Sequence, residues 1–231
     1  QIIISKQKKI IEKNIKKQIA DLSNKKLYYN SNYKINKINK KNFILSFKNK
    51  ELTFLKPNLI GNHQIENAST AIATTYILKE LGYHFSKKRI ENGIRKTLWP
   101  GRLEKGSLGS TMVYIDGAHN IDGVTQILHY FKSKKIKLWL MIGMLKNKNI
   151  SGFLKKIKPI INGVIAIPIP NEINSFKTEE ITNECKKLRI NYHSFTSVNK
   201  ANNYIKNELK PKTLLISGSL YLVGKIRNKY L

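Results

Sequence analysis

The chain contains one cysteine, Cys185, among its 231 residues. A single cysteine excludes an internal disulfide and a metal site built from several cysteines, and it fits a reducing compartment such as the cytoplasm, where we expect the protein to act. No run of about 18 apolar residues occurs, so the sequence predicts no transmembrane helix. The first six residues do not resemble a signal peptide, because the basic residues follow the apolar run and no small-residue cleavage site is present.

Acidic residues are scarce, with 14 Asp and Glu against 43 Lys and Arg, and the net charge is +29. Arginine is scarce too, since only 5 of the 43 basic residues are Arg. Nucleic-acid sites favour Arg forks and stacked aromatic rings, whereas the lysines here are scattered in ones and twos. Lys, Ile and Asn make up 97 of the 231 residues, and all three have codons rich in A and T. We therefore interpret the charge as a solvated surface and expect no nucleic-acid or membrane partner; a functional polyanion site is the alternative.

The remaining composition is that of a globular protein, with 41% hydrophobic and 25% charged residues. The length fits one large or two small domains. The chain begins with Gln1 and not with Met, so we expect it to be a piece of a longer protein.

Residues 1–97 carry mixed patterns. Apolar spacing predicts a strand at 2–5, an amphipathic helix over 6–23, and short antiparallel strands within 24–56 with turns at 30–32 and 49–50. Two helices follow, a buried one from Ala68 to Leu81 and one over 86–95 with Ser86 as its N-cap.

Residues 98–231 begin with a linker, Leu98 to Glu104, and then alternate strands with helices. The expected strands are 113–115, 136–142, 164–168, 192–195 and 213–217; the expected helices are 121–132, 150–161, 178–188, 198–209 and one from 220. This alternation predicts a mostly parallel Rossmann-like α/β sheet with helices on both faces. Ligands of such sheets bind beyond the carboxyl ends of the strands.

The segment Asp116-Gly-Ala-His119-Asn120 follows a strand and precedes a helix. A carboxylate at a strand end can accept hydrogen bonds from a ribose diol, and His119 would point into the same crevice. The alternative is a turn in which the Asp and Asn side chains only cap.

Two further polar residues stand at element boundaries. Arg102 lies in the linker, where a guanidinium suits a bidentate phosphate contact; the alternative is an ion pair with Glu104. Asn67 opens the buried helix and could face a ligand; the alternative is simple N-capping.

The run from Ser217 to Lys225 is not a P-loop, because five residues separate Gly218 from Gly224 where four are required. The five histidines have no metal-ligand spacing, and we assign no metal ligands to the chain.

Five motifs in order resemble the C-terminal half of folylpolyglutamate synthase/dihydrofolate synthase, a branch of the Mur ligase superfamily. They are Gly61-x-His63-Gln64-x-x-Asn67-Ala68, Pro100-Gly101-Arg102-Leu-Glu104, Asp116-Gly-Ala-His119-Asn120, Gly143-Met-Leu-x-x-Lys148 and Gly218-Ser219-Leu-Tyr-Leu-Val-Gly224. The resemblance implies that residues 1–97 are the C-terminal part of a central ATPase domain and that 98–231 form the Rossmann-like C-terminal domain.

The resemblance also implies an activity. Such enzymes activate the carboxylate of dihydropteroate or of a folate with ATP, and the amine of L-glutamate attacks the acyl phosphate. By this likeness Asn67, Arg102 and Asp116 contact ATP, with Arg102 on phosphates and Asp116 on ribose hydroxyls or at the hinge beside them. His119 and Ser219 line the pocket for the acyl phosphate and glutamate.

The P-loop, the Mg²⁺ ligands and the carbamylated lysine of this family have no match in the chain. We therefore expect a C-terminal fragment of a monomeric cytoplasmic enzyme of folate and one-carbon metabolism, unable to turn over alone. The alternatives are a free-standing nucleotide- or polyanion-binding module and a Mur-type ligase for another amino-acid acceptor.

Overall fold

The chain divides into two compact units, residues 1–98 and 99–231. The computed structural model describes all residues from 1 to 231. The division lies one residue from the predicted boundary, directly before Trp99-Pro100-Gly101, where proline and glycine interrupt regular structure. The two units are described separately below.

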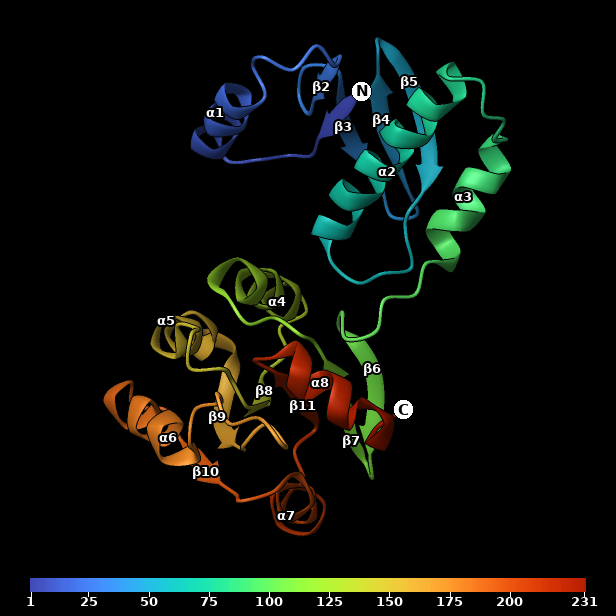
Figure 1. Cartoon of the computed structure of the whole chain (residues 1–231). Helices are drawn as coiled ribbons and strands as arrows, with labels where there is room; N and C mark the ends of the chain where they lie inside the picture. Colours follow the sequence, from blue (N-terminus) through green and yellow to red (C-terminus); the bar gives the residue numbers. More distant parts are fainter. The chain divides into compact units, whose positions relative to one another are not determined.

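In the first unit a long helix packs on a three-stranded antiparallel sheet (Figure 1). The elements in chain order are β1 (Ile2–Ile4), α1 (Lys9–Gln18), β2 (Lys26–Tyr28), β3 (Tyr33–Ile38), β4 (Asn42–Phe47), β5 (Lys50–Leu55), α2 (Asn62–Glu80) and α3 (Lys87–Lys96). Strands β3, β4 and β5 form the antiparallel sheet, as predicted for this region. Strand β2 differs from the prediction, because it pairs in parallel with β1.

The core of this unit lies between α2 and the sheet. Alternate residues of β4, Phe43, Leu45 and Phe47, are buried against α2 residues such as Ile72 and Ala73. This alternation is the pattern of a strand with one buried face.

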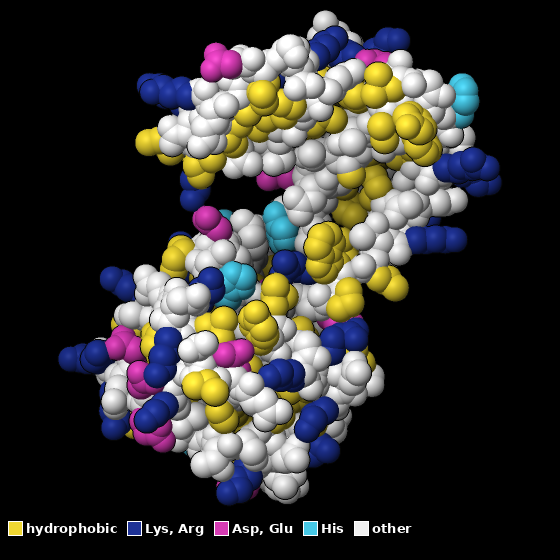
Figure 2. Space-filling view, viewed as in Figure 1, with side chains coloured by type: hydrophobic (Ala, Val, Ile, Leu, Met, Phe, Trp, Pro, Cys, Tyr) yellow, Lys and Arg dark blue, Asp and Glu magenta, His cyan; other side chains and the backbone are white.

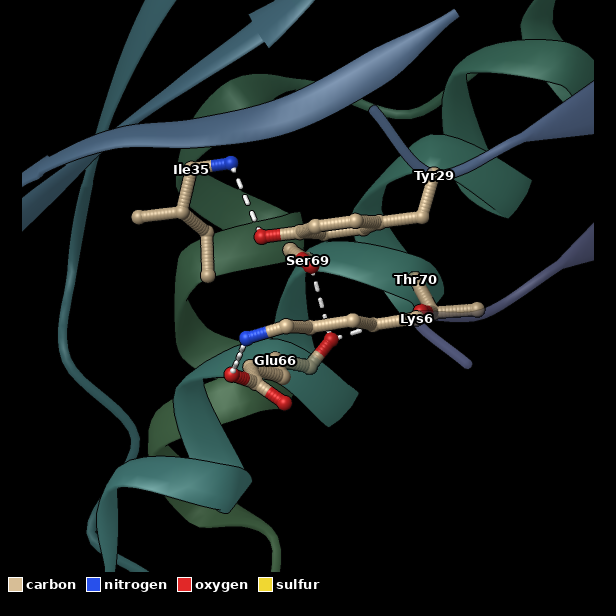
Figure 3. Close-up of polar contacts among 6 residues, drawn as sticks. All are labelled: Lys6, Tyr29, Ile35, Glu66, Ser69 and Thr70. Atoms are coloured by element: carbon tan, nitrogen blue, oxygen red, sulfur yellow. Dashed lines mark hydrogen bonds and ion pairs between the residues drawn. The ribbon is translucent and has the colours of Figure 1, made fainter. Parts of the chain in front are cut away.

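Polar contacts join the segment after β1 to α2 (Figure 3). The Lys6 ammonium lies 2.6 Å from the Glu66 carboxylate, and the Ser69 hydroxyl donates to the Glu66 carbonyl at 2.7 Å. The Tyr29 hydroxyl accepts from the Ile35 main-chain N–H at 3.2 Å. The Lys6–Glu66 pair thus joins the segment after β1 to α2, the helix that carries Asn67.

Two predicted helix boundaries in this unit were wrong. Helix α1 is shorter than the expected 6–23. None of its residues is buried, so no packing against a core stabilises further helical turns at its ends. Helix α2 begins at Asn62 and not at Ala68, because Gly61, at φ 112°, turns the chain directly into the helix. The predicted N-cap of α3 is confirmed, since the Ser86 hydroxyl accepts from the Arg89 N–H at 3.2 Å.

The second unit is a six-stranded sheet covered by helices on both faces (Figure 1). Its strands are β6 (Glu104–Leu108), β7 (Thr111–Ile115), β8 (Leu138–Ile142), β9 (Ile161–Ala166), β10 (Tyr192–Ser194) and β11 (Thr213–Ser217). Its helices are α4 (Ile121–Ser133), α5 (Ile150–Ile157), α6 (Thr178–Lys187), α7 (Val198–Tyr204) and α8 (Leu220–Ile226), with short helical turns η1 (Lys158–Ile160), η2 (Ile205–Leu209) and η3 (Arg227–Lys229).

The strand order β10-β9-β8-β11-β7-β6 confirms the predicted mostly parallel sheet. Strand β11 lies between β7 and β8 and is parallel to both. The carboxyl ends of these three strands are therefore neighbours, and their polar loops meet at one edge of the sheet.

Both faces of the sheet are buried. Val113 and Ile115 of β7 belong to the cluster with α7 and α8, whereas Tyr114 between them packs edge-on against Phe131 of α4, with ring centroids 4.9 Å apart. Burial on both faces explains why the central strands read as continuous apolar runs.

Strand β6 was missed by the sequence analysis, which placed a linker through Glu104. It forms an antiparallel edge next to β7. The side of β6 that faces away from β7 approaches the main chain at Tyr230, where the Ser107 N–H donates to the Tyr230 carbonyl at 2.7 Å. A Cβ at Gly106 would lie 2.2 Å from that carbonyl oxygen, so only glycine permits the approach.

The expected helix over 150–161 is also shorter, since α5 ends at Ile157 and Pro159 lies in the following η1 turn. None of the helices in the chain is long and apolar enough to cross a membrane.

We expect the Phe131→Ala substitution to destabilise the second unit by about 3–5 kcal/mol, because Phe131 is fully buried and its removal leaves a cavity. Both tryptophans, Trp99 and Trp139, lie in this unit, so urea unfolding followed by tryptophan fluorescence reports on it alone. The matched control is Met112→Ala, at a position 49% exposed, which should change stability by less than about 0.5 kcal/mol. Equal effects of the two substitutions would contradict this packing.

Candidate functional site

Three polar loops meet where β7, β11 and β8 end. The Ala118 carbonyl, after β7, accepts from the Gly218 N–H at 2.9 Å and from the Ser217 hydroxyl at 3.2 Å. A Cβ at Gly218 would lie 2.8 Å from the Gly143 carbonyl oxygen after β8. The Asp116–Asn120 and Ser217–Ser219 segments therefore lie side by side in the second unit.

The turn that carries Arg102 is held against this edge by three hydrogen bonds. The Gly101 carbonyl accepts from the Gly117 N–H at 2.8 Å, and the Gly101 N–H donates to the Glu104 carboxylate at 3.0 Å. The Leu103 N–H donates to the Asp116 carboxylate at 2.9 Å. Leu103 has φ 47°, a left-handed conformation unusual for leucine, and its side chain is buried. Both neighbours of Arg102 are therefore fixed.

Asp116 is buried and its carboxylate is occupied by main-chain donors. One oxygen accepts from Leu103 and the other from the Ala118 N–H at 2.8 Å. Burial raises the pKa of the Asp116 carboxyl, while the two N–H donors and the charge on Arg102 act to lower it. Of the two predicted roles, this geometry favours the one at the hinge over a contact with ribose hydroxyls.

Arg102 is the cation of the site. Its guanidinium carbon lies 6.0 Å from the centre of the Trp99 ring, and one of its terminal nitrogens lies 3.6 Å from where a Cβ of Gly117 would be. It makes no hydrogen bond or ion pair with another protein group, so its donors remain available to an anion. Such a partly exposed guanidinium on a fixed turn suits a phosphate.

His119 also approaches Gly117. Its Nδ1 is 3.1 Å from the Gly117 carbonyl oxygen. Because a carbonyl can only accept, Nδ1 is the donor in this arrangement. Arg102 and His119 thus both approach Gly117, and the structure brings these two predicted residues together.

Ser219 is placed differently from a reactive hydroxyl. It is 2% exposed, and its oxygen accepts from the Tyr221 N–H at 3.1 Å as the N-cap of α8. In this conformation the hydroxyl stabilises the start of α8.

Asn67 belongs to the first unit. It is exposed on α2, and its side-chain amide donates to the Gln64 side chain at 3.1 Å. The N-capping alternative for Asn67 is wrong, because α2 starts at Asn62 with Gly61 in the N-cap position.

The sequence analysis missed Arg227. The alternative partner proposed for Arg102 was Glu104, and this pairing is wrong: Glu104 binds Arg227 of η3, with Nη2–Oε1 at 2.5 Å and Nε–Oε2 at 3.1 Å. The hydrogen bond from Arg227 is the main reason that the pKa of Glu104 is lowered. The scarcity of arginine could have drawn attention to Arg227. The chain has only five arginines, and two of them, Arg102 and Arg227, lie close to Glu104.

Other reactive groups do not converge. No three His, Cys, Asp or Glu side chains come together in a way that could hold a metal ion. Burial raises the pKa of the Cys185 thiol to about 12, so it is not a thiolate near neutral pH. On the face shown in Figure 2, Lys and Arg side chains are spread over both units and form no single patch.

Comparison with known families gives residues 101–220 as a Mur ligase, glutamate ligase domain, which is 120 of the 231 residues. The chain belongs to this family. The match begins at Gly101 and ends at Leu220, so it includes Arg102, Asp116, His119 and Ser219.

The curated relatives include the dihydrofolate synthase/folylpolyglutamate synthase of Bacillus subtilis, 29% identical over 195 residues, which covers 80% of this chain and 43% of that protein. The folylpolyglutamate synthase of Lacticaseibacillus casei is 25% identical over 181 residues, covering 77% and 40%. These relatives confirm the similarity inferred from the five motifs.

Solved structures show the same fold. The Mycobacterium tuberculosis folylpolyglutamate synthase complexed with ADP and AMPPCP superposes with a TM-score of 0.83 at 17% identity, over 98% of this chain and 54% of that one. The Escherichia coli FolC in complex with DHPP and ADP gives 0.79 at 24% identity, over 94% and 50%. The chain therefore spans about half the length of the relatives that it matches.

We expect the Gly218→Ala substitution to destabilise the second unit by about 2–4 kcal/mol, because Gly218 has φ 108° and an added Cβ would meet the Gly143 carbonyl and Ile142. Gly224→Ala is the control: Gly224 lies in α8 with no atom within 4 Å of an added Cβ. The control should be as stable as the wild type or more stable by up to about 1 kcal/mol. Urea unfolding measured by tryptophan fluorescence compares them, and a neutral Gly218→Ala would contradict the close approach of the two loops.

The pairing of Glu104 predicts a pH dependence of stability. Because the pKa of Glu104 is lowered in the folded state, its stabilising effect is complete above the ordinary value of 4.5 and is lost as the pH falls through the lowered value. The wild type should therefore exceed Glu104→Gln in free energy of unfolding at about pH 6, and the difference should shrink towards about pH 3. Glu208→Gln, which removes an exposed carboxylate without an ion-pair partner, is the control for net charge. A difference that is the same at both pH values would exclude a stabilising Glu104 carboxylate.

Proposed function

We propose that this chain is the C-terminal part of an ATP-dependent amide ligase that adds L-glutamate to dihydropteroate, to folates or to both. The carboxylate of the acceptor is activated as an acyl phosphate, and the amine of glutamate displaces the phosphate. The P-loop and the Mg²⁺ ligands belong to a part of the enzyme outside these residues. Its place of action is the cytoplasm, in folate and one-carbon metabolism.

The observation that carries the proposal is the Arg102 guanidinium, fixed beside Gly117 without a protein acceptor. The transition state of phosphoryl transfer is stabilised by positive charge that is already in place before the reaction. An arginine on a turn fixed by hydrogen bonds supplies such a charge. The glutamate ligase domain match and the relatives solved with ADP support a nucleotide as the anion.

The other residues have supporting roles in this proposal. Asp116 holds the Arg102 turn through the Leu103 N–H, and the His119 imidazole is held at Gly117, which is bonded to the same turn. Ser219 caps the start of α8. ATP, when bound, supplies the phosphoryl group that activates the acceptor; by the family resemblance, Asn67 is also proposed to contact ATP.

The test uses the full-length gene product that contains this chain. ATP-dependent incorporation of labelled glutamate is measured with dihydropteroate and with tetrahydrofolate as acceptors. The wild type should incorporate glutamate into at least one, and Arg102→Ala should lower kcat/KM by about 30-fold or more, equivalent to about 2 kcal/mol of transition-state stabilisation. Arg102→Lys should lie between the two, because an ammonium keeps the charge but not the two-point geometry.

Arg95→Ala is the matched control, since Arg95 is an exposed arginine in the last turn of α3. It should retain wild-type kinetics. Failure of the wild type with both acceptors would overturn the folate assignment, and wild-type kinetics in Arg102→Ala would overturn the phosphate role.

A further inference from the structure

Arg227 and Glu104 form a two-point ion pair between residues far apart in the sequence. Two nitrogens of the guanidinium contact the two carboxylate oxygens, at 2.5 and 3.1 Å. The side chains are 27% and 23% exposed, so the pair is partly shielded from solvent. Forks of this geometry hold a carboxylate in one orientation.

The orientation of Glu104 matters because its Oε2 also accepts from the Gly101 N–H at 3.0 Å. Gly101 directly precedes Arg102, and Leu103, which follows it, is bound by Asp116. Two carboxylates thus fix the residues on either side of Arg102, and only the Glu104 carboxylate is itself held by a side chain.

Arg227 also keeps Glu104 from competing with an anion for the Arg102 guanidinium. Glu104 is only two residues from Arg102, and it is the nearest carboxylate in the sequence that could pair with it. In the structure both of its oxygens are taken by Arg227 and Gly101. Arg227 directs its remaining terminal nitrogen to Asn228, at 3.1 Å, so it is not placed as a ligand itself.

We propose that Arg227 is a positioning residue of the nucleotide site: by occupying Glu104 it fixes the Arg102 turn and keeps the Arg102 guanidinium unpaired for phosphate. This inference rests on the proposed function of Arg102. Loss of Arg227 leaves Glu104 to pair with Arg102, which withdraws the cation from the anion that it binds.

The experiment is ADP binding by calorimetry to the full-length gene product, with wild type, Arg102→Ala, Arg227→Ala, Arg227→Lys and the double variant Arg227→Ala/Glu104→Gln. Arg227→Ala should weaken ADP binding by about 10-fold, and Arg227→Lys by less. The double variant should recover to within about 3-fold of the wild type, because the competing charge is gone.

The double variant separates positioning from a structural role. If Arg227 only stabilised the fold, removing Glu104 as well would restore nothing, so a double variant as weak as Arg227→Ala would overturn the proposal. Wild-type binding by both Arg227 variants would overturn it too. Where Arg227→Ala does not fold, as judged by tryptophan fluorescence, the comparison of Arg227→Lys with Arg227→Lys/Glu104→Gln decides in the same way.

The Arg102→Ala variant separates the phosphate role of Arg102 from the positioning role of Arg227. If it binds ADP as tightly as the wild type, the phosphate role of Arg102 fails, and the positioning role fails with it. If it binds weakly while the Arg227 variants bind normally, the proposed function stands and only the role of Arg227 is wrong.

Discussion

A buried carboxylate at the end of β7 determines the geometry of the candidate site. Asp116 accepts one main-chain N–H from its own loop and one from Leu103, and so joins the turn at the start of the second unit to the edge of its sheet. Desolvating a carboxylate is costly, and the two donors together with the Arg102 charge offset only part of that cost, because the pKa of Asp116 stays raised. The left-handed Leu103, the Gly101–Gly117 bond and the position of Arg102 all depend on this connection.

The repeating parts of the fold could be predicted from the sequence because they follow from apolar periodicity. The five parallel strands and their helices were expected in this way. The antiparallel β6 was not, because Glu104-Lys-Gly-Ser-Leu108 has one buried apolar residue and takes its regularity from β7 and from the Tyr230 main chain. Such tertiary pairing leaves little trace in local sequence.

The site was predictable in its residue types but not in its partners. Asp116, Arg102 and His119 stand at element boundaries near the carboxyl ends of the strands, where ligands bind in this kind of sheet, and the resemblance to a known family, not spacing, singled them out. Spacing could not decide whether Glu104 pairs with Arg102 or with Arg227, because residues 104 and 227 are far apart in the sequence and meet only in the folded unit. For the same reason the buried, capping position of Ser219 emerges only from the helix that follows it.

The approach of Tyr230 to β6 reduces the tendency of this edge of the sheet to pair with strands of other chains. An exposed edge strand offers unpaired main-chain groups to any other strand, and chains with such edges tend to associate. Here the Ser107 N–H is already used, and Gly106 lets the Tyr230 carbonyl come close enough to cover that side. The opposite edge, β10, has only three residues. The sheet is thus protected at one edge by its own chain and at the other by shortness, which limits its capacity to seed intermolecular strand pairing while a newly made chain folds.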